Sequence, residues 1–148
     1  MTMLQKYSLV ALRVTLGWYF LYAGFTKIID SSWSAAGYLN SAKTFPGFFA
    51  WLASPENIGW VSTLNEWALF LVGAALVLGI FVRFASWGGI VLMTLYWLPV
   101  LDFPHVGHGF IIDDHIIFIA VFVVLAAFNP KNSPRLCRGV STSERMKT

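Results

Sequence analysis

Four long apolar stretches constrain this chain more than any other feature. They cover residues 7–29, 58–81, 84–101 and 109–128, and each approaches the roughly 20 residues that an α-helix needs to cross about 30 Å of hydrocarbon. A soluble all-α protein is the alternative, but only 11% of the residues are charged, which is too few to cover so much apolar surface. The sequence therefore predicts an all-α integral membrane protein whose four transmembrane helices form a bundle.

Residues 30–56 separate the first two apolar stretches and are too many for a plain turn. They contain SWSAAGYLNSAK and PGFFAWLAS, which mix aromatic residues with small and polar ones and are split by Pro46. Aromatic side chains gather where a membrane meets water. We therefore expect two short interfacial helices on the outer surface, with Trp33, Trp51 and Trp60 at the depth of the lipid head groups.

The charged residues outside the apolar stretches predict the orientation. Basic residues lie on one side of the predicted bundle: Lys6, Arg83, Lys131, Arg135, Arg138, Arg145 and Lys147. The loops on the other side carry mainly Asp30, Glu56 and Asp102, against Lys43. The positive-inside rule then places both termini of this multi-pass protein in the cytoplasm. We expect one membrane domain, residues 1–130, and a basic, disordered tail, 131–148, facing anionic lipid rather than nucleic acid.

Three charged residues interrupt the first two stretches, where an unpaired charge is costly. Arg13 and Lys27 share one face of the first helix with small and aromatic residues, in the order Arg13, Gly17, Phe20, Gly24 and Lys27. At 1.5 Å per residue, Arg13 lies roughly 9 Å from the cytoplasmic end and Glu66 about 12 Å from the outer one. Charged residues inside a membrane usually face the bundle interior and pair. We therefore expect Arg13 to pair with Glu66.

The fourth stretch contains GFIIDDHIIFIA, in which Asp113, Asp114 and His115 stand inside an apolar run. A helix long enough to span the membrane would start near Gly109 and draw all three groups below the outer surface. Alternatively, the helix begins at Asp113 and the two acids cap its positive end. Both interpretations stay open for the acids, whereas an interior position is favoured for His115, because Ile116 and Ile117 follow it.

No motif for a bound metal or a redox cofactor is present. His105 and His108, taken with His115, match no strong pattern of metal-ligand spacing, so no metal site is expected. The sequence contains no haem, flavin or iron–sulfur motif either. Electrons would therefore have to come directly from a substrate or from a partner.

Two segments resemble a known membrane family. RVTLGWYFLYAGFTKII is similar to the first helix of the DoxX/DoxD family, and NEWALFLVGAALVLGIFVRFASWGG is similar to its second motif. SAAGYL and PGFFAWLA resemble the linker of the DoxD branch, the membrane subunit of thiosulfate:quinone oxidoreductase. The likeness covers roughly residues 12–128. The family's C-terminal Gly-Arg-x-x-Gly-Leu-Asp pattern is replaced here by SPRLCRG.

The resemblance implies a four-helix bundle in a prokaryotic cytoplasmic membrane, which serves the quinone-linked oxidation of sulfur compounds beside a DoxA-like subunit. Quinone reduction takes up two protons, so titratable groups beside the quinone have a chemical purpose. We expect Glu66, Asp114 and His115 to transfer protons, with activity that depends on pH between about 5 and 8. Binding or neutralising roles are expected for Arg13, Lys27 and Asp113. The alternatives are a non-catalytic scaffold of a redox complex, assembled with a second subunit or with its own copies, and, less favoured, a small transporter.

Overall fold

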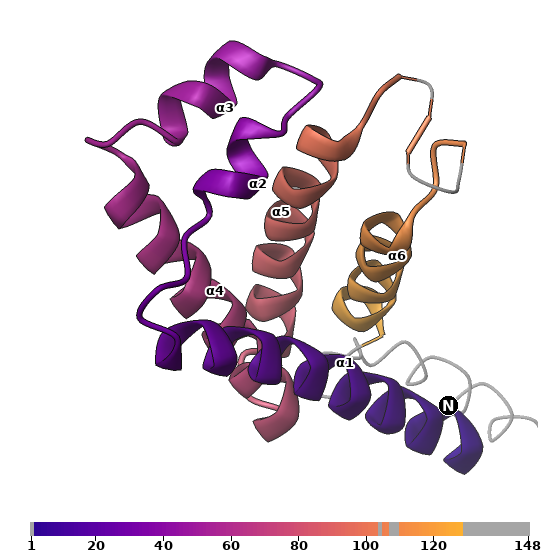
Figure 1. Ribbon diagram of the computed structural model, residues 1–148. Coiled ribbons are helices and arrows are strands. Elements are labelled where there is room, and N and C mark those ends of the chain that lie inside the picture. Colours follow the sequence, from indigo (N-terminus) through magenta and orange to yellow (C-terminus); the bar gives the residue numbers. More distant parts are fainter. Residues whose placement is uncertain (1, 104, 107–109, 129–148) are drawn as a thin grey trace, which may run out of the picture.

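The computed structural model describes residues 2–103, 105–106 and 110–128. This part of the chain holds six α-helices (Figure 1): α1 (Met3–Ile29), α2 (Ala36–Asn40), α3 (Pro46–Leu52), α4 (Ile58–Leu78), α5 (Val82–Val100) and α6 (Asp114–Ala127). The prediction of an all-α fold is confirmed for these residues. The predicted tail, 131–148, and His108 lie outside them.

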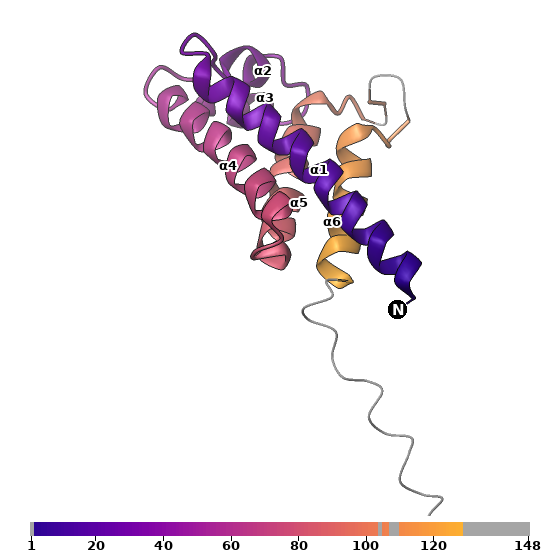
Figure 2. The ribbon, with the colours of Figure 1, turned by 90° about the horizontal axis from the view of Figure 1, so that it is seen from below.

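Helices α1 and α4 pack side by side and run antiparallel (Figure 2). A methyl group at Gly24 would lie 2.4 Å from the backbone nitrogen of Phe70, and one at Gly73 would lie 2.2 Å from that of Leu21. Small residues therefore let the two backbones approach closely. The predicted inward stripe of α1 is confirmed, because all its members are buried or partly buried: Arg13, Gly17, Phe20, Gly24 and Lys27.

A tight turn reverses the chain between α4 and α5. Gly79 caps α4 in the left-handed conformation, with φ of 71°, which glycine adopts without a steric penalty. Phe81 is also left-handed, with φ of 48°, directly before α5. The tight connection predicted around Phe81-Val82-Arg83 is confirmed, although α4 ends before the predicted boundary at Phe81.

Helix α6 packs antiparallel against α5 and also touches α1. The ring of Phe122 fills the space beside Gly89, where a methyl group would lie 2.2 Å from the Phe122 Cζ. Phe20 meets Phe118 and Phe122 edge-on, with ring centroids 5.8 and 5.2 Å apart. All four long helices thus contribute to one apolar core: Leu16, Phe20, Leu69, Val72, Leu76, Val82, Met93, Phe122 and Leu125.

The two short helices predicted between the first and second long helices are present as α2 and α3. Pro46 occupies the first turn of α3, where its missing N–H costs no hydrogen bond. The two helices share a small core of their own, formed by Ala35, Leu39 and Phe49. This pair covers the end of the bundle at which α1 and α5 finish and α4 begins (Figure 1).

Helix α6 begins at Asp114, so the predicted start near Gly109 is wrong. The carboxylate of Asp113 is the N-cap and accepts a hydrogen bond from the backbone N–H of Ile116 at 3.2 Å. A carboxylate satisfies the free N–H groups of a first helical turn and suits its positive dipole end. Capping therefore decides the boundary, and residues 110–113 are not helical. The capping interpretation is confirmed for Asp113.

Helices α1 and α4 are each long and apolar enough to cross a membrane, whereas α6 is apolar but has only 14 residues. Large apolar side chains also point outward from the long helices. Trp18 is 63% exposed, Leu78 69% and Phe84 76%. So much apolar surface on the outside of a bundle is typical of contact with lipid or with another protein.

Candidate functional site

A cavity of about 560 Å³ lies between α4 and α5, with α2 and α3 at one end. Its size falls within the roughly 300–1,000 Å³ that is typical of small-molecule sites. Most of its lining residues are apolar or aromatic. The polar side chains that line it are Lys27, Ser34, Tyr38, Asn65 and Tyr96.

Three of these polar groups form a hydrogen-bonded chain across the bundle. The Tyr96 hydroxyl donates to Oδ1 of Asn65 at 2.8 Å and accepts a long contact, 3.5 Å, from Nζ of Lys27. The chain joins α1, α4 and α5. Because the tyrosine proton is committed to Asn65, the donors that this chain leaves to face a ligand are the ammonium of Lys27 and the amide NH₂ of Asn65.

The position of Lys27 follows from its place in the last turn of α1. A cation is favoured at the negative, C-terminal end of a helix dipole. The ammonium also lies over the ring of Trp33, 3.9 Å from its centroid, in a cation–π contact. These contacts hold one positive charge at the edge of an otherwise apolar cavity.

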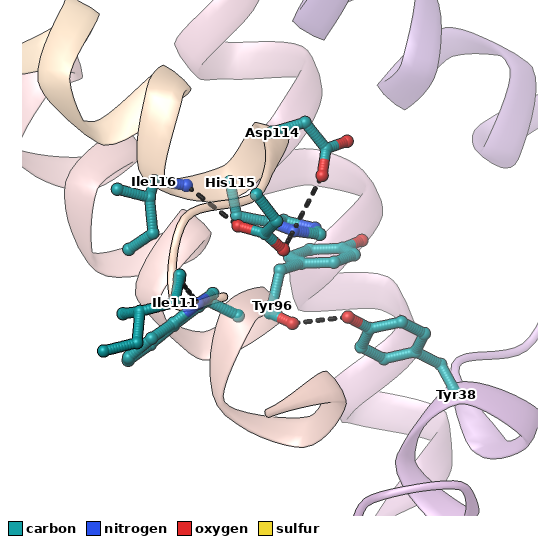
Figure 3. Close-up of polar contacts among 8 residues, drawn as sticks. Tyr38, Tyr96, Ile111, Asp114, His115 and Ile116 are labelled. Carbon is teal, nitrogen blue, oxygen red and sulfur yellow. Dashed lines mark hydrogen bonds and ion pairs between the residues drawn. The ribbon is translucent and has the colours of Figure 1, made fainter. Parts of the chain in front are cut away.

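Tyr38 fastens α2 to α5, because its hydroxyl donates a hydrogen bond to the backbone carbonyl of Tyr96 (Figure 3). The two rings also pack, with centroids 5.4 Å apart. Burial is the main cause that raises the pKa of Tyr38, and the nearby Tyr96, Asp113 and Asp114 raise it further. Tyr38 is therefore a neutral hydrogen-bond donor at physiological pH.

Tyr96 also links the cavity to the histidine and the acids that precede and begin α6 (Figure 3). Its ring stacks on the imidazole of His115 with centroids 5.8 Å apart. Nδ1 of His115 lies 2.7 Å from Oδ2 of Asp113 and 3.3 Å from Oδ1 of Asp114. The His115 side chain is 19% exposed and that of Asp114 is 68% exposed. His115 thus has the interior position that was predicted, while Asp114 faces outward.

The predicted site residues other than Arg13 therefore differ in how they reach the cavity. Lys27 lines the cavity, whereas His115 reaches it only through the ring of Tyr96. Glu66 is partly buried on α4 beside Asn65 and acts electrostatically on Lys27, but its side chain does not line the cavity.

The predicted pairing of Arg13 with Glu66 is wrong. No ion pair joins them among the described residues, and the Arg13 guanidinium lies against Gly79, where a methyl group would be 2.7 Å from its Nη1. The antiparallel register explains the difference, because it brings Arg13 to the C-terminal end of α4 and Lys27 to the level of Glu66. Nε of Arg13 is buried, and no residue in the described part of the chain is its hydrogen-bond partner.

Asp113, Asp114 and His115 place one possible metal-ligand atom each within 4.8 Å of one another. The contacts of Asp113 already have a role in the fold, because this residue caps α6 and orients the imidazole of His115. His105, considered with His115 in the sequence, is exposed and packs edge-on against Phe110. The geometry thus gives Asp113 a part in holding the start of α6 and leaves His105 apart from the three residues.

Three residues of this site were not predicted from the sequence: Tyr38, Asn65 and Tyr96. Asn65 could have been predicted from the sequence, because an amide inside an apolar helix tends to face a polar partner. The two tyrosines could not, since tyrosine is common in membrane-facing and core positions alike.

These features define a helical bundle with candidate membrane spans and an internal cavity that is polar at one end. The chain belongs to the DoxX family, a family of membrane proteins, whose sequence pattern matches residues 8–101. The matched region covers α2 to α5 and nearly all of α1, and it includes Lys27, Asn65, Glu66 and Tyr96; α6 lies beyond it. No curated protein and no solved structure matches the chain.

Proposed function

We propose that this DoxX protein is the membrane subunit of a quinone-linked oxidoreductase of the thiosulfate:quinone type. The observation that carries the proposal is the cavity, in which mostly apolar walls surround the hydrogen-bond donors of Lys27 and Asn65. A quinone has the complementary form, a flat apolar ring with two carbonyl oxygens that accept hydrogen bonds. The resemblance to the DoxD branch supplies the sulfur substrate and a DoxA-like partner subunit, with self-assembly as the alternative arrangement.

The proposal includes four membrane spans, formed by α1, α4, α5 and α6, in a prokaryotic cytoplasmic membrane. The four helices alternate in direction, which suits a multi-pass bundle. Lys6 and Arg83 lie at the end where α1 and α5 begin, and Asp30 and Asp102 at the end where these helices finish. Both termini are then cytoplasmic, and the polar end of the cavity lies in the outer half of the membrane. The 14 residues of α6 cover about 21 Å, and a bilayer can thin locally around a short span.

In this proposal the residues of the chain bind the quinone and deliver protons, while the partner or the sulfur substrate delivers two electrons. Lys27 donates to one quinone carbonyl and stabilises the negative charge that develops on its oxygen. Glu66 balances the charge of Lys27. The exposed Asp114 exchanges protons with water and with His115, 3.3 Å away, and the imidazole, stacked on Tyr96, holds a proton beside the cavity. Uptake of two protons and two electrons completes the conversion to quinol.

A non-catalytic scaffold is the second candidate. The observation in its favour is that Asp113 and His115 already serve the fold, since Asp113 caps α6 and His115 packs on Tyr96. A scaffold needs the polar groups to hold helices together and has no need of a ligand in the cavity.

Binding of decylubiquinone to the purified protein in lipid nanodiscs tests the proposal. Lys27→Met should weaken binding by about tenfold or more, because a hydrogen bond to a charged group is lost. Lys43→Met is the matched control, since Lys43 lies at the same end but pairs with Asp102 at the surface, 2.9 Å away. No binding to the folded parent, or equal affinity of the parent and Lys27→Met, favours the scaffold.

A further inference from the structure

The cavity is lined by one continuous face of each of two helices. On α5 the lining residues recur at steps of three and four: Gly88, Val91, Leu92, Leu95 and Tyr96. On α4 they do the same: Val61, Leu64, Asn65 and Ala68. Such spacing places each set on a single helix face. The cavity is therefore an elongated groove that follows both helices, which diverge from their connecting turn toward α2 and α3 (Figure 1).

The polar groups of the groove are confined to one end. Tyr96 and Asn65 stand near α2, whereas Gly88 lies eight residues before Tyr96, or about 12 Å along the helix axis. The α5 residues from Gly88 to Leu95 that line the groove offer no polar side chain. A compact polar ligand would leave this far half unfilled, and a second polar group on the ligand would find no side-chain partner there.

The wall of the far half is open to the outside of the bundle. Val91, which lines the groove on α5, is 59% exposed. Gly88 is also exposed, and a methyl group there would meet a single atom within 4 Å, Cγ2 of Val72 at 3.7 Å. An exposed glycine in the wall thus leaves a gap between α4 and α5, about 9 Å from the start of α5.

We propose that the groove binds a ligand with one long apolar tail, which leaves the bundle between α4 and α5 past Gly88 and enters the lipid. This inference rests on the proposed function, which places the head group of the ligand at Lys27, Asn65 and Tyr96. It adds the class of the tail and the path by which the tail leaves the bundle. The isoprenoid tail of a membrane quinone has the required form. Gly88 is then the residue that determines whether a tail is accepted.

The test compares the parent with Gly88→Leu, using decylubiquinone and its tail-less dimethoxy-methyl-benzoquinone analogue. Calorimetric titration of each probe into protein in phosphatidylcholine nanodiscs gives the affinities, and partitioning into the lipid cancels because it is the same for both proteins. A leucine in the gap should weaken decylubiquinone binding by about tenfold or more through steric exclusion, while the tail-less analogue binds as before. Val91→Phe, on the same wall, should act in the same direction.

Gly59→Leu is the matched control, because Gly59 lies on α4 outside the groove and a methyl group there would meet nothing within 4 Å. Circular dichroism checks that every variant is folded. Loss of affinity for both quinones in equal measure, or for neither, overturns the tail path. If the parent binds neither quinone, the titration is repeated with decanol. A lower affinity of Gly88→Leu than of the parent for decanol supports the tail path and contradicts the quinone function. Equal affinity of the two proteins for decanol contradicts both.

Discussion

The ring of Tyr96 on α5 lies on the imidazole of His115 on α6, with the two planes inclined by only 17°. The hydroxyl of the same tyrosine joins Lys27 and Asn65 at the cavity. One side chain therefore contacts the polar end of the groove and the histidine that pairs with Asp113. A substitution on either side of this ring should therefore affect the residues on the other side.

Tyr96→Phe separates the two roles of this residue, because it keeps the stacked ring and removes the hydroxyl. Oδ1 of Asn65 then loses its donor, so we expect the free energy of unfolding to fall by about 1–3 kcal/mol. Titration with dodecyl sulfate in mixed micelles measures the change. Tyr22→Phe serves as the control, since Tyr22 is 61% exposed on α1 and its hydroxyl has no hydrogen bond among the described residues. Equal stability of both variants contradicts a contribution from the hydrogen-bonded chain.

Lys27 and Glu66 should be energetically coupled, and Arg13 and Glu66 should not. Double-mutant cycles with Lys27→Met, Arg13→Met and Glu66→Gln measure both terms in the free energy of unfolding. Neighbouring groups typically show coupling of about 0.5–3 kcal/mol, whereas distant groups add within about 0.5 kcal/mol. The reason for the difference is that Arg13 lies at Gly79, at the far end of α4. A larger coupling for Arg13 than for Lys27 would show that the register of α1 on α4 is different.

The long helices could be predicted from the sequence because apolar length and helix-ending residues act locally. The start of α6 could not, since the length of the apolar run favoured Gly109 and the capping chemistry favoured Asp113. Only the folded chain shows that capping prevails at this point.

The candidate site was predicted in part. Lys27 and His115 are conspicuous because charged or titratable groups are rare in apolar runs. The partner of Glu66 depends on how α1 slides along α4, which is set by the contacts of Gly24 and Gly73 over the whole interface rather than by depth alone. The role of Tyr96 was not predictable, because it depends on side chains of α1, α2, α4 and α6 that meet at this residue.

The close contact of α1 and α4 predicts opposite effects for two glycines of α4. Gly73→Ala places a methyl group 2.2 Å from the backbone of Leu21, so the helices must separate and the free energy of unfolding should fall by about 1–3 kcal/mol. Gly59→Ala meets nothing within 4 Å and should raise it by about 0.5–1 kcal/mol, because alanine favours a helix. The same detergent titration compares the two variants. Destabilisation of equal size at both positions would argue against tight packing at Gly73.

The buried hydroxyl of Tyr38 predicts a loss of stability in alkali. Burial raises the pKa of Tyr38 in the folded protein above the value of about 10 found in an unfolded chain. The folded state therefore holds this proton more tightly, so its contribution is complete below about pH 10 and falls as the pH rises toward the folded pKa. Tyr38→Phe should lack this part of the alkaline decline, which pH-dependent unfolding of the two proteins measures. Parallel alkaline profiles for the two proteins contradict the prediction.

The orientation of the chain can be tested through Cys137, its sole cysteine, in the basic segment 131–148. The positive-inside rule places Cys137 in the cytoplasm and Glu56, in the connection before α4, on the outer face. An impermeant maleimide added to intact cells should therefore leave the parent unlabelled. It should label Glu56→Cys in a Cys137→Ser background, since residue 56 is exposed. Both proteins should react after the cells are permeabilised. Labelling of Cys137 in intact cells, with no labelling at position 56, would reverse the orientation and place the polar end of the cavity in the cytoplasmic half of the membrane.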